Sequence, residues 1–193
     1  MKSNPDRRTE RWILIAFLAV RLAFILVSSK LHLDLDRDNE RYDQQSTAIL
    51  QGNFDLETPL FITSPFYSYY QALHKLVFGA HWRFSLGLVQ LVLSCLSGVA
   101  LFRIAKRLFD RRVALLSAAI YCVFPLTLLW VNTLAQDMPF QLHLIFFIYA
   151  LQLMMERHSW KWTVVAASLF ALTFLTKSHI LLFAPFIPLI VWS

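Results

Sequence analysis

The sequence predicts an all-α polytopic membrane protein with about six transmembrane helices and a large first extracytoplasmic loop that contains two juxtamembrane helices. Hydrophobic residues make up 58% of the 193 residues, and the mean hydropathy of +0.54 exceeds that of soluble globular proteins. The apolar residues gather into long runs, and Lys and Arg are concentrated in the short turns between them. Both observations are typical of a chain that crosses a membrane several times.

The first apolar run, residues 12–28, follows a basic segment. It is long for the apolar part of a signal peptide, and no A-x-A-like cleavage site follows it, so it is expected to remain as a membrane anchor. A long loop, residues 29–83, comes next. Further spans are predicted at 84–102, 113–131, 138–155, 162–175 and 180–192.

The last two runs are 14 and 13 residues long, and a short polar stretch from Thr176 to His179 separates them. Three interpretations stay open: two short or tilted spans, a re-entrant pair, or one complete helix followed by another that is cut off at Ser193. Residues 1–193 are therefore expected to form a single membrane module that is incomplete at its C-terminus.

The positions of Lys and Arg predict the orientation. Residues 1–11, 103–112 and 156–161 hold eleven of the 18 basic residues, whereas the turn between the third and fourth spans holds none. By the positive-inside rule the N-terminus is cytoplasmic and the loop 29–83 faces outward, in the inner or plasma membrane of the cell. The same distribution accounts for the net charge of +6, so no nucleic-acid partner is expected.

Two helices are predicted inside the loop 29–83. Ser64 and Pro65 form a typical helix start, and apolar residues then recur at spacings of three and four as far as Ala80. Polar residues occupy the opposite face, so this helix is expected to lie in the interface plane of the membrane. A weaker pattern predicts a shorter helix from about Asp38 to just before Gly52.

The loop also carries seven of the 12 acidic residues. Asp34, Asp36 and Asp38 alternate as in a calcium-binding loop, but Asn39 and Gln45 stand where Gly and Glu are required. No dedicated metal site and no certain cofactor are therefore expected, although a divalent cation can still be attracted to these carboxylates. Each of them is either a solvated loop residue or, at a membrane surface, a candidate general base.

Four further charged or titratable residues lie outside this loop. Asp137 can serve as the N-cap of the fourth span, as a catalytic group, or as both. Arg21 lies near the middle of the first span and is expected to need an anionic partner. Lys177 and His179 interrupt an apolar stretch, where they either make snorkelling and helix–helix contacts or bind the phosphate of a lipid.

Taken in order, several short motifs resemble the N-terminal part of the GT-C glycosyltransferases, in the group of protein O-mannosyltransferases and lipid A aminoarabinose transferases. DNERYDQQSTAILQG is similar to the first-loop pattern and SPFYSYY to the start of the second juxtamembrane helix. LFDRRVALLSAA resembles the basic cytoplasmic turn, AQDMPF the acidic second outer loop, and LTFLTK the late basic motif. Members of the family generally run to several hundred residues, with more spans than this chain.

The resemblance implies a glycosyltransferase that moves a hexosyl or pentosyl group from a polyprenyl-phosphate donor to an acceptor glycan, protein or lipid at the extracytoplasmic face. Asp38 is expected to act as general base, and Asp137 to position the acceptor or assist. The donor phosphate is expected to contact Lys177, Arg21 and His179. Supporting roles are expected for Tyr42, Asp43 and Tyr67. Membrane lipids are the other expected partners.

Two alternatives compete with this interpretation. In a transporter or lipid flippase, Arg21, His143 and Lys177 would line a path through the membrane. A non-catalytic membrane subunit, or a truncated fragment of a longer enzyme, would suit the short length of the chain.

Overall fold

The computed structural model describes residues 5–28, 37–54, 65–133 and 135–187. No strand occurs in these ranges, which confirms the all-α fold class of the membrane protein. The helices are α1 (Pro5–Ser28), α2 (Arg37–Leu50), α3 (Pro65–Phe78), the 3-10 helix η1 (Gly79–His81), α4 (Trp82–Leu108), α5 (Arg111–Val123), α6 (Pro125–Asn132), α7 (Asp137–Arg157), α8 (Trp160–Thr176) and the 3-10 helix η2 (Ser178–Phe183).

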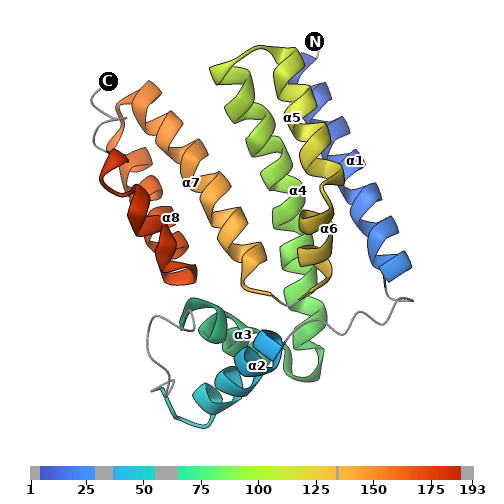
Figure 1. Cartoon of the computed structure of the whole chain (residues 1–193), viewed down its shortest axis with the longest axis vertical. Helices are drawn as coiled ribbons and strands as arrows, with labels where there is room; N and C mark the ends of the chain where they lie inside the picture. Colours follow the sequence, from blue (N-terminus) through green and yellow to red (C-terminus); the bar gives the residue numbers. More distant parts are fainter. Residues whose placement is uncertain (1–4, 29–36, 55–64, 134, 188–193) are drawn as a thin grey trace.

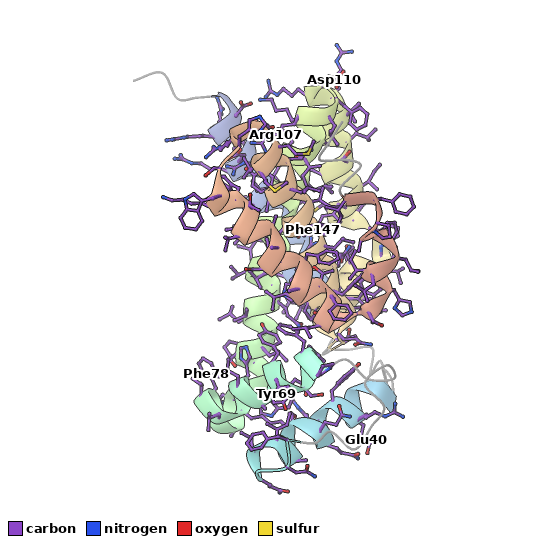
Figure 2. All side chains as sticks on the ribbon, turned by 90° about the vertical axis from the view of Figure 1, so that its left-hand side faces the viewer. Glu40, Tyr69, Phe78, Arg107, Asp110 and Phe147 are labelled. Carbon is purple, nitrogen blue, oxygen red and sulfur yellow. The ribbon has the colours of Figure 1, made fainter. Side chains whose placement is uncertain are left out.

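The long helices form a bundle, and α2 and α3 form a cap beyond one end of it (Figure 1). Helices α1 and α5 pack on one side of α4, and the hairpin of α7 and α8 lies on the other side. Tyr69 and Phe78 lie in the cap, whereas Arg107 and Asp110 lie at the opposite end of the molecule (Figure 2). We call these two ends the cap end and the basic end.

Three stretches of the described chain are helical, long and apolar enough to cross a membrane: Asp6–Ser28, Pro65–Leu108 and Asp137–Arg157. They contain the predicted spans 12–28, 84–102 and 138–155. Helix α8 covers the predicted span 162–175, although its 17 residues make it shorter than the other three.

The predicted span 113–131 differs from the structure, because it is divided between α5 and α6. Phe124 has an extended backbone (ψ 120°), and Pro125 begins the next helix. Proline lacks a backbone N–H and disfavours the helical conformation of the residue before it, so the helix stops at Val123. With 13 residues α5 is about 20 Å long, which is shorter than a hydrocarbon core of about 30 Å.

The predicted span 180–192 also begins differently, because residues Ser178–Phe183 form the 3-10 helix η2. Residues 188–192 lie outside the described ranges. The three interpretations of this C-terminal stretch therefore stay open.

Helices α1 and α4 approach closely where Phe17 lies on Gly98. A Cβ atom at Gly98 would stand 2.5 Å from the ring of Phe17, so only glycine leaves room for the ring at this position. Phe17 is 1% exposed and belongs to the main apolar cluster of the bundle. This contact lets α1 pack closely against the middle of α4.

Ion pairs join the helices at the basic end. Arg103 donates two hydrogen bonds of 2.7 Å to the Glu10 carboxylate, one to each oxygen. The ammonium of Lys106 lies 2.5 Å from the Asp6 carboxylate. These two pairs connect α4 to α1, with the acidic residues of α1 turned toward α4.

Both predicted loop helices are present, as α2 and α3. The apolar face of α3 is open, since Leu73, Leu76 and Val77 are 56–72% exposed. The opposite polar face is packed against α2: Ser68 Oγ donates to Gln45 Oε1 at 2.7 Å. The cap is thus held together by polar side chains and presents an apolar surface, as expected for a helix pair at a membrane interface.

Candidate functional site

Two residues expected to act on the sugar donor and acceptor meet at the cap end of the bundle. The Lys177 ammonium forms an ion pair with the Asp137 carboxylate. Asp137 is the first residue of α7, and Lys177 directly follows the last residue of α8. Because α7 and α8 run antiparallel, the start of one lies beside the end of the other.

Asp137 is not the N-cap of α7, as one interpretation of the sequence held, because Gln136 takes that position. In the first helical turn its carboxylate still interacts favourably with the helix dipole. The side chains of Asp137 and Lys177 are 31% and 27% exposed. The pair is therefore partly desolvated yet within reach of a molecule at the surface.

The first turn of α3 contacts His143 of α7, close to the Asp137–Lys177 ion pair. The His143 ring lies edge-on to Phe66 with 5.1 Å between ring centroids. Its Nδ1 atom lies 3.2 Å from Thr176 Oγ1, next to Lys177 in the chain. His143 thus joins α7 to α8 and to the cap, beside the ion pair.

An apolar cavity of about 660 Å³ runs along α7 from this place toward the basic end. Phe140 and His179 line it near the ion pair, and Arg107 and Glu156 line its other end. Lys177 does not line the cavity itself, but its ammonium lies 5.7 Å from the centroid of the Phe140 ring, which does. The remaining lining side chains are mostly aliphatic or aromatic, among them Leu144, Phe147, Ile148, Leu151 and Phe183.

The length of this cavity suits a lipid chain. Sixteen residues of one α-helix separate Phe140 from Glu156, which corresponds to about 24 Å. That is most of the thickness of a hydrocarbon core. At the basic end Arg107 is paired with Glu156, whereas His179 lines the cap end, so the slot has the shape and polarity of a site for a long-chain lipid with a polar head at the cap end.

Asp38 is the second residue of α2, but its side chain lies outside the described part of the structure. The helix that carries it is held against α3 by Tyr42 and Tyr67, whose rings meet edge to face at 5.1 Å. Both rings are almost fully buried, with exposed fractions of 2% and 0%. The packing of these two rings holds α2 against α3.

Asp43, the other carboxylate predicted to support the site, is engaged in the cap. Its side chain lies 2.5 Å from the Lys75 ammonium and 3.2 Å from the Arg83 guanidinium. Lys75 also donates to the main-chain carbonyl of Asp43 and to Thr47 Oγ1, each at 2.8 Å. These bonds connect α2 to α3 and to the first turn of α4.

Arg21 lies apart from the other candidates. It is 1% exposed, its Nε donates to Ser94 Oγ at 2.5 Å and its Nη1 to the Cys122 carbonyl at 3.5 Å. Its guanidinium also lies 4.4 Å from the centroid of the Phe17 ring. The partners are neutral groups of α1, α4 and α5, while α8 lies on the far side of the bundle (Figure 1). This placement does not support the prediction that Arg21 binds the donor phosphate.

Sequence reasoning did not find Phe140, Thr176 or the cavity. Helix α7 is apolar nearly all round, so its sequence gives no single face to which a cavity could be assigned. The described ranges contain no cluster of three or more His, Cys, Asp or Glu side chains that could hold a metal ion. Asp34 and Asp36, two of the loop carboxylates considered for a divalent cation, lie outside those ranges.

Comparison with known proteins gives one match. A family model described as dolichyl-phosphate-mannose-protein mannosyltransferase matches residues 62–193. The matched stretch includes Tyr67, Asp137, Lys177 and His179, but not Asp38. Neither the curated proteins nor the solved structures gave a match.

Proposed function

This chain belongs to the dolichyl-phosphate-mannose-protein mannosyltransferase family of GT-C membrane glycosyltransferases, and from this premise we propose that it transfers a sugar from a polyprenyl-phosphate donor to an acceptor at the cap end. The observation that carries the proposal is the Asp137–Lys177 pair beside Phe140, a residue that lines the apolar cavity along α7. By the positive-inside argument the cap end is the extracytoplasmic side of the cell membrane.

The donor is proposed to lie with its isoprenoid chain in the cavity and its phosphate at Lys177 and His179. The chain passes from one apolar medium, the bilayer, to another, so its burial adds little affinity and the phosphate contact is the specific anchor. The phosphate needs a cation near this apolar slot, and the proximity of Lys177 to Phe140 together with the lining position of His179 supports this assignment. A phosphate that reaches Lys177 replaces Asp137 as its partner and frees the Asp137 carboxylate.

The acceptor is proposed to bind between Asp38 of the cap and Asp137 of α7. Its hydroxyl or amine attacks the anomeric carbon of the sugar, and the bond from that carbon to the phosphate oxygen breaks. The acceptor proton passes to the Asp38 carboxylate, while polyprenyl phosphate leaves with the bonding electrons. Lys177 stabilises the charge that grows on the departing phosphate.

A transporter is the weaker candidate. Arg21, His143 and Lys177 were expected to line a path. Arg21 contacts neutral groups in the bundle core, His143 contacts Thr176 and Phe66, and Lys177 pairs with Asp137. These contacts would be the same in a non-catalytic subunit and in an enzyme, so an activity measurement is needed to distinguish these two functions.

Replacement of Asp38 by Asn tests the proposal. Membranes that contain the full chain are incubated with radiolabelled polyprenyl-phosphate sugars, including a mannosyl and an aminoarabinosyl donor, and donor consumption and donor binding are both measured. Loss of a general base lowers turnover by about 100-fold or more while leaving donor binding intact. Glu40→Gln is the matched control, because Glu40 is an exposed carboxylate two residues further along α2.

Normal turnover in the Asp38→Asn variant would show that Asp38 is not the base. If none of the donors binds to or is consumed by the unsubstituted chain, the transferase proposal itself fails.

A further inference from the structure

A second groove lies on the opposite side of α4 from the cavity along α7. It has a volume of about 350 Å³ and runs between α1 and α5. Its floor includes Ile13, Phe17 and Ala118, none more than 8% exposed, and its walls include Trp12 and Leu115, which are 60% and 41% exposed. The groove is therefore an open, shallow furrow with a buried apolar floor.

The groove has the length of one membrane leaflet. It is lined by α1 from Thr9 to Phe17, and eight residues of helix correspond to about 12 Å. Half of a hydrocarbon core is about 15 Å thick. One acyl chain of a phospholipid in the leaflet on the basic-end side matches this length.

Cations gather where the groove opens at the basic end. Arg111 Nη2 donates to Thr9 Oγ1 at 3.0 Å, and Thr9 lines the groove. Arg112 precedes Leu115 by three residues and Arg8 precedes Trp12 by four, spacings that place each pair on the same helix face. All three arginines are exposed, and none forms an ion pair with a carboxylate in the described ranges.

The carboxylates of Asp6, Glu10 and Asp110 bind other partners, so they do not neutralise Arg8, Arg111 and Arg112. Asp6 and Glu10 of α1 pair with α4 through Lys106 and Arg103. Arg8 is two residues from Asp6 and two from Glu10, a rotation of about 200° around the helix axis, so it lies on the opposite face of α1 from both. Asp110 accepts a hydrogen bond from the Val113 backbone N–H and caps α5. Helix α1 thus presents acidic side chains to α4 and a basic edge to the groove.

We infer that the groove between α1 and α5 is a binding site for an anionic phospholipid of the basic-end leaflet. One acyl chain lies on the buried floor, and the phosphate and a further negative or neutral headgroup lie among Arg8, Arg111 and Arg112. Basic pockets at helix ends attract anionic headgroups in this way. A zwitterionic headgroup brings its own cation among the three arginines and binds less well. This site does not depend on glycosyl transfer, because the donor cavity is on the other side of α4.

The test uses the purified full chain in detergent, with bound lipids counted by native mass spectrometry during titration. The probes are phosphatidylglycerol, phosphatidylcholine with the same acyl chains, and glycerol phosphate, which has no chain. Arg111→Gln and Arg112→Gln remove headgroup contacts, and Lys161→Gln is the matched control, an exposed cation at the start of α8. Ala119→Phe fills the groove without changing charge, and Ala171→Phe is its control on the exposed face of α8.

The expected result is one phosphatidylglycerol per chain, bound in preference to phosphatidylcholine, with no binding of glycerol phosphate. Each Arg→Gln substitution weakens phosphatidylglycerol binding about fivefold, and Ala119→Phe removes the bound lipid, while both α8 controls bind normally. Arg112 is exposed and forms no hydrogen bond or ion pair with the residues that the structure describes, so the effect of its replacement is not a consequence of unfolding. Equal binding of the two phospholipids, an equal loss in Lys161→Gln, or normal binding in Ala119→Phe would each overturn the inference.

Discussion

Lys177 and Asp137, forty residues apart in the chain, form the ion pair that joins the end of α8 to the start of α7. The pair closes the α7–α8 hairpin at the cap end, directly beside the contact of His143 with Thr176. It therefore has two consequences to separate by measurement: it stabilises the hairpin, and it holds a cation and a carboxylate close to the proposed donor site.

A double-mutant cycle with Lys177→Met and Asp137→Asn measures the first consequence. The side chains are 27% and 31% exposed, so we expect a coupling free energy of about 1 kcal/mol, above that of a solvent-exposed pair. Thermal unfolding of the four proteins gives the coupling. Strictly additive effects would mean that the two residues do not stabilise each other.

The same two variants separate roles in donor binding. Under the proposed function, Lys177→Met weakens donor binding strongly, because the phosphate loses its cation. Asp137→Asn leaves donor binding unchanged or strengthens it, since no carboxylate then competes for Lys177. Equal losses of donor affinity in both variants would contradict the exchange of partners at Lys177.

Replacement of Gly98 by Ala is expected to destabilise the bundle. The added Cβ would stand 2.5 Å from the Phe17 ring, and overpacking of this kind costs about 1–3 kcal/mol. Gly87→Ala, in the same helix with nothing within 4 Å of its added Cβ, is the control and is expected to be neutral or slightly stabilising. Thermal unfolding compares the two, and Phe17→Leu in the Gly98→Ala background should restore part of the loss. A Gly98→Ala protein as stable as Gly87→Ala would exclude the close contact.

Arg21→Gln is expected to lower stability without lowering donor affinity. Arg21 donates to Ser94 Oγ and to the Cys122 carbonyl inside the bundle, and a buried group left without its partner costs about 1–3 kcal/mol. Thermal unfolding and donor binding are measured on the same preparation. Normal stability with lost donor binding would instead assign Arg21 to the phosphate.

Asp43→Ala is expected to loosen the cap. Asp43 pairs with Lys75 and Arg83, but its side chain is 37% exposed, so solvent screening limits the effect to about 1 kcal/mol. Hydrogen exchange of the α2 backbone should become several-fold faster. Glu40→Ala, on the same helix and with a 3.4 Å contact only to Gln44 in the described ranges, should leave exchange unchanged. Equal exchange in both variants would show that the Asp43 bonds do not hold the cap.

Much of the fold follows from local sequence. Pro65 after Ser64 marks the start of α3, and the run ahead of Gly52 marks α2. The break at Phe124 was missed because the hydropathy of the run 113–131 is high on both sides of it. Pro125 was the available signal, since it restricts the backbone of the residue before it.

The site was less accessible to sequence reasoning. Asp137 and Lys177 were each predicted, from a short acidic turn and a cation in an apolar stretch, but their pairing depends on the antiparallel packing of α7 and α8. The anionic partner expected for Arg21 is replaced by a hydroxyl, a carbonyl and an aromatic ring. Sequence indicates that a buried cation needs compensation, but not that neutral groups from three helices supply it.

The division of α3 into a polar face bound to α2 and an open apolar face fixes how deep the cap sits. Moving the cap away from the membrane would expose Leu73, Leu76 and Val77 to water. Moving it deeper would place the charged residues of α2 in hydrocarbon, which is costly. The catalytic carboxylate proposed on α2 is thereby kept at a constant height above the acyl chains. Under the proposed function, an acceptor therefore presents its reacting group at the level of the lipid headgroups, whether it arrives from the water or from within the leaflet.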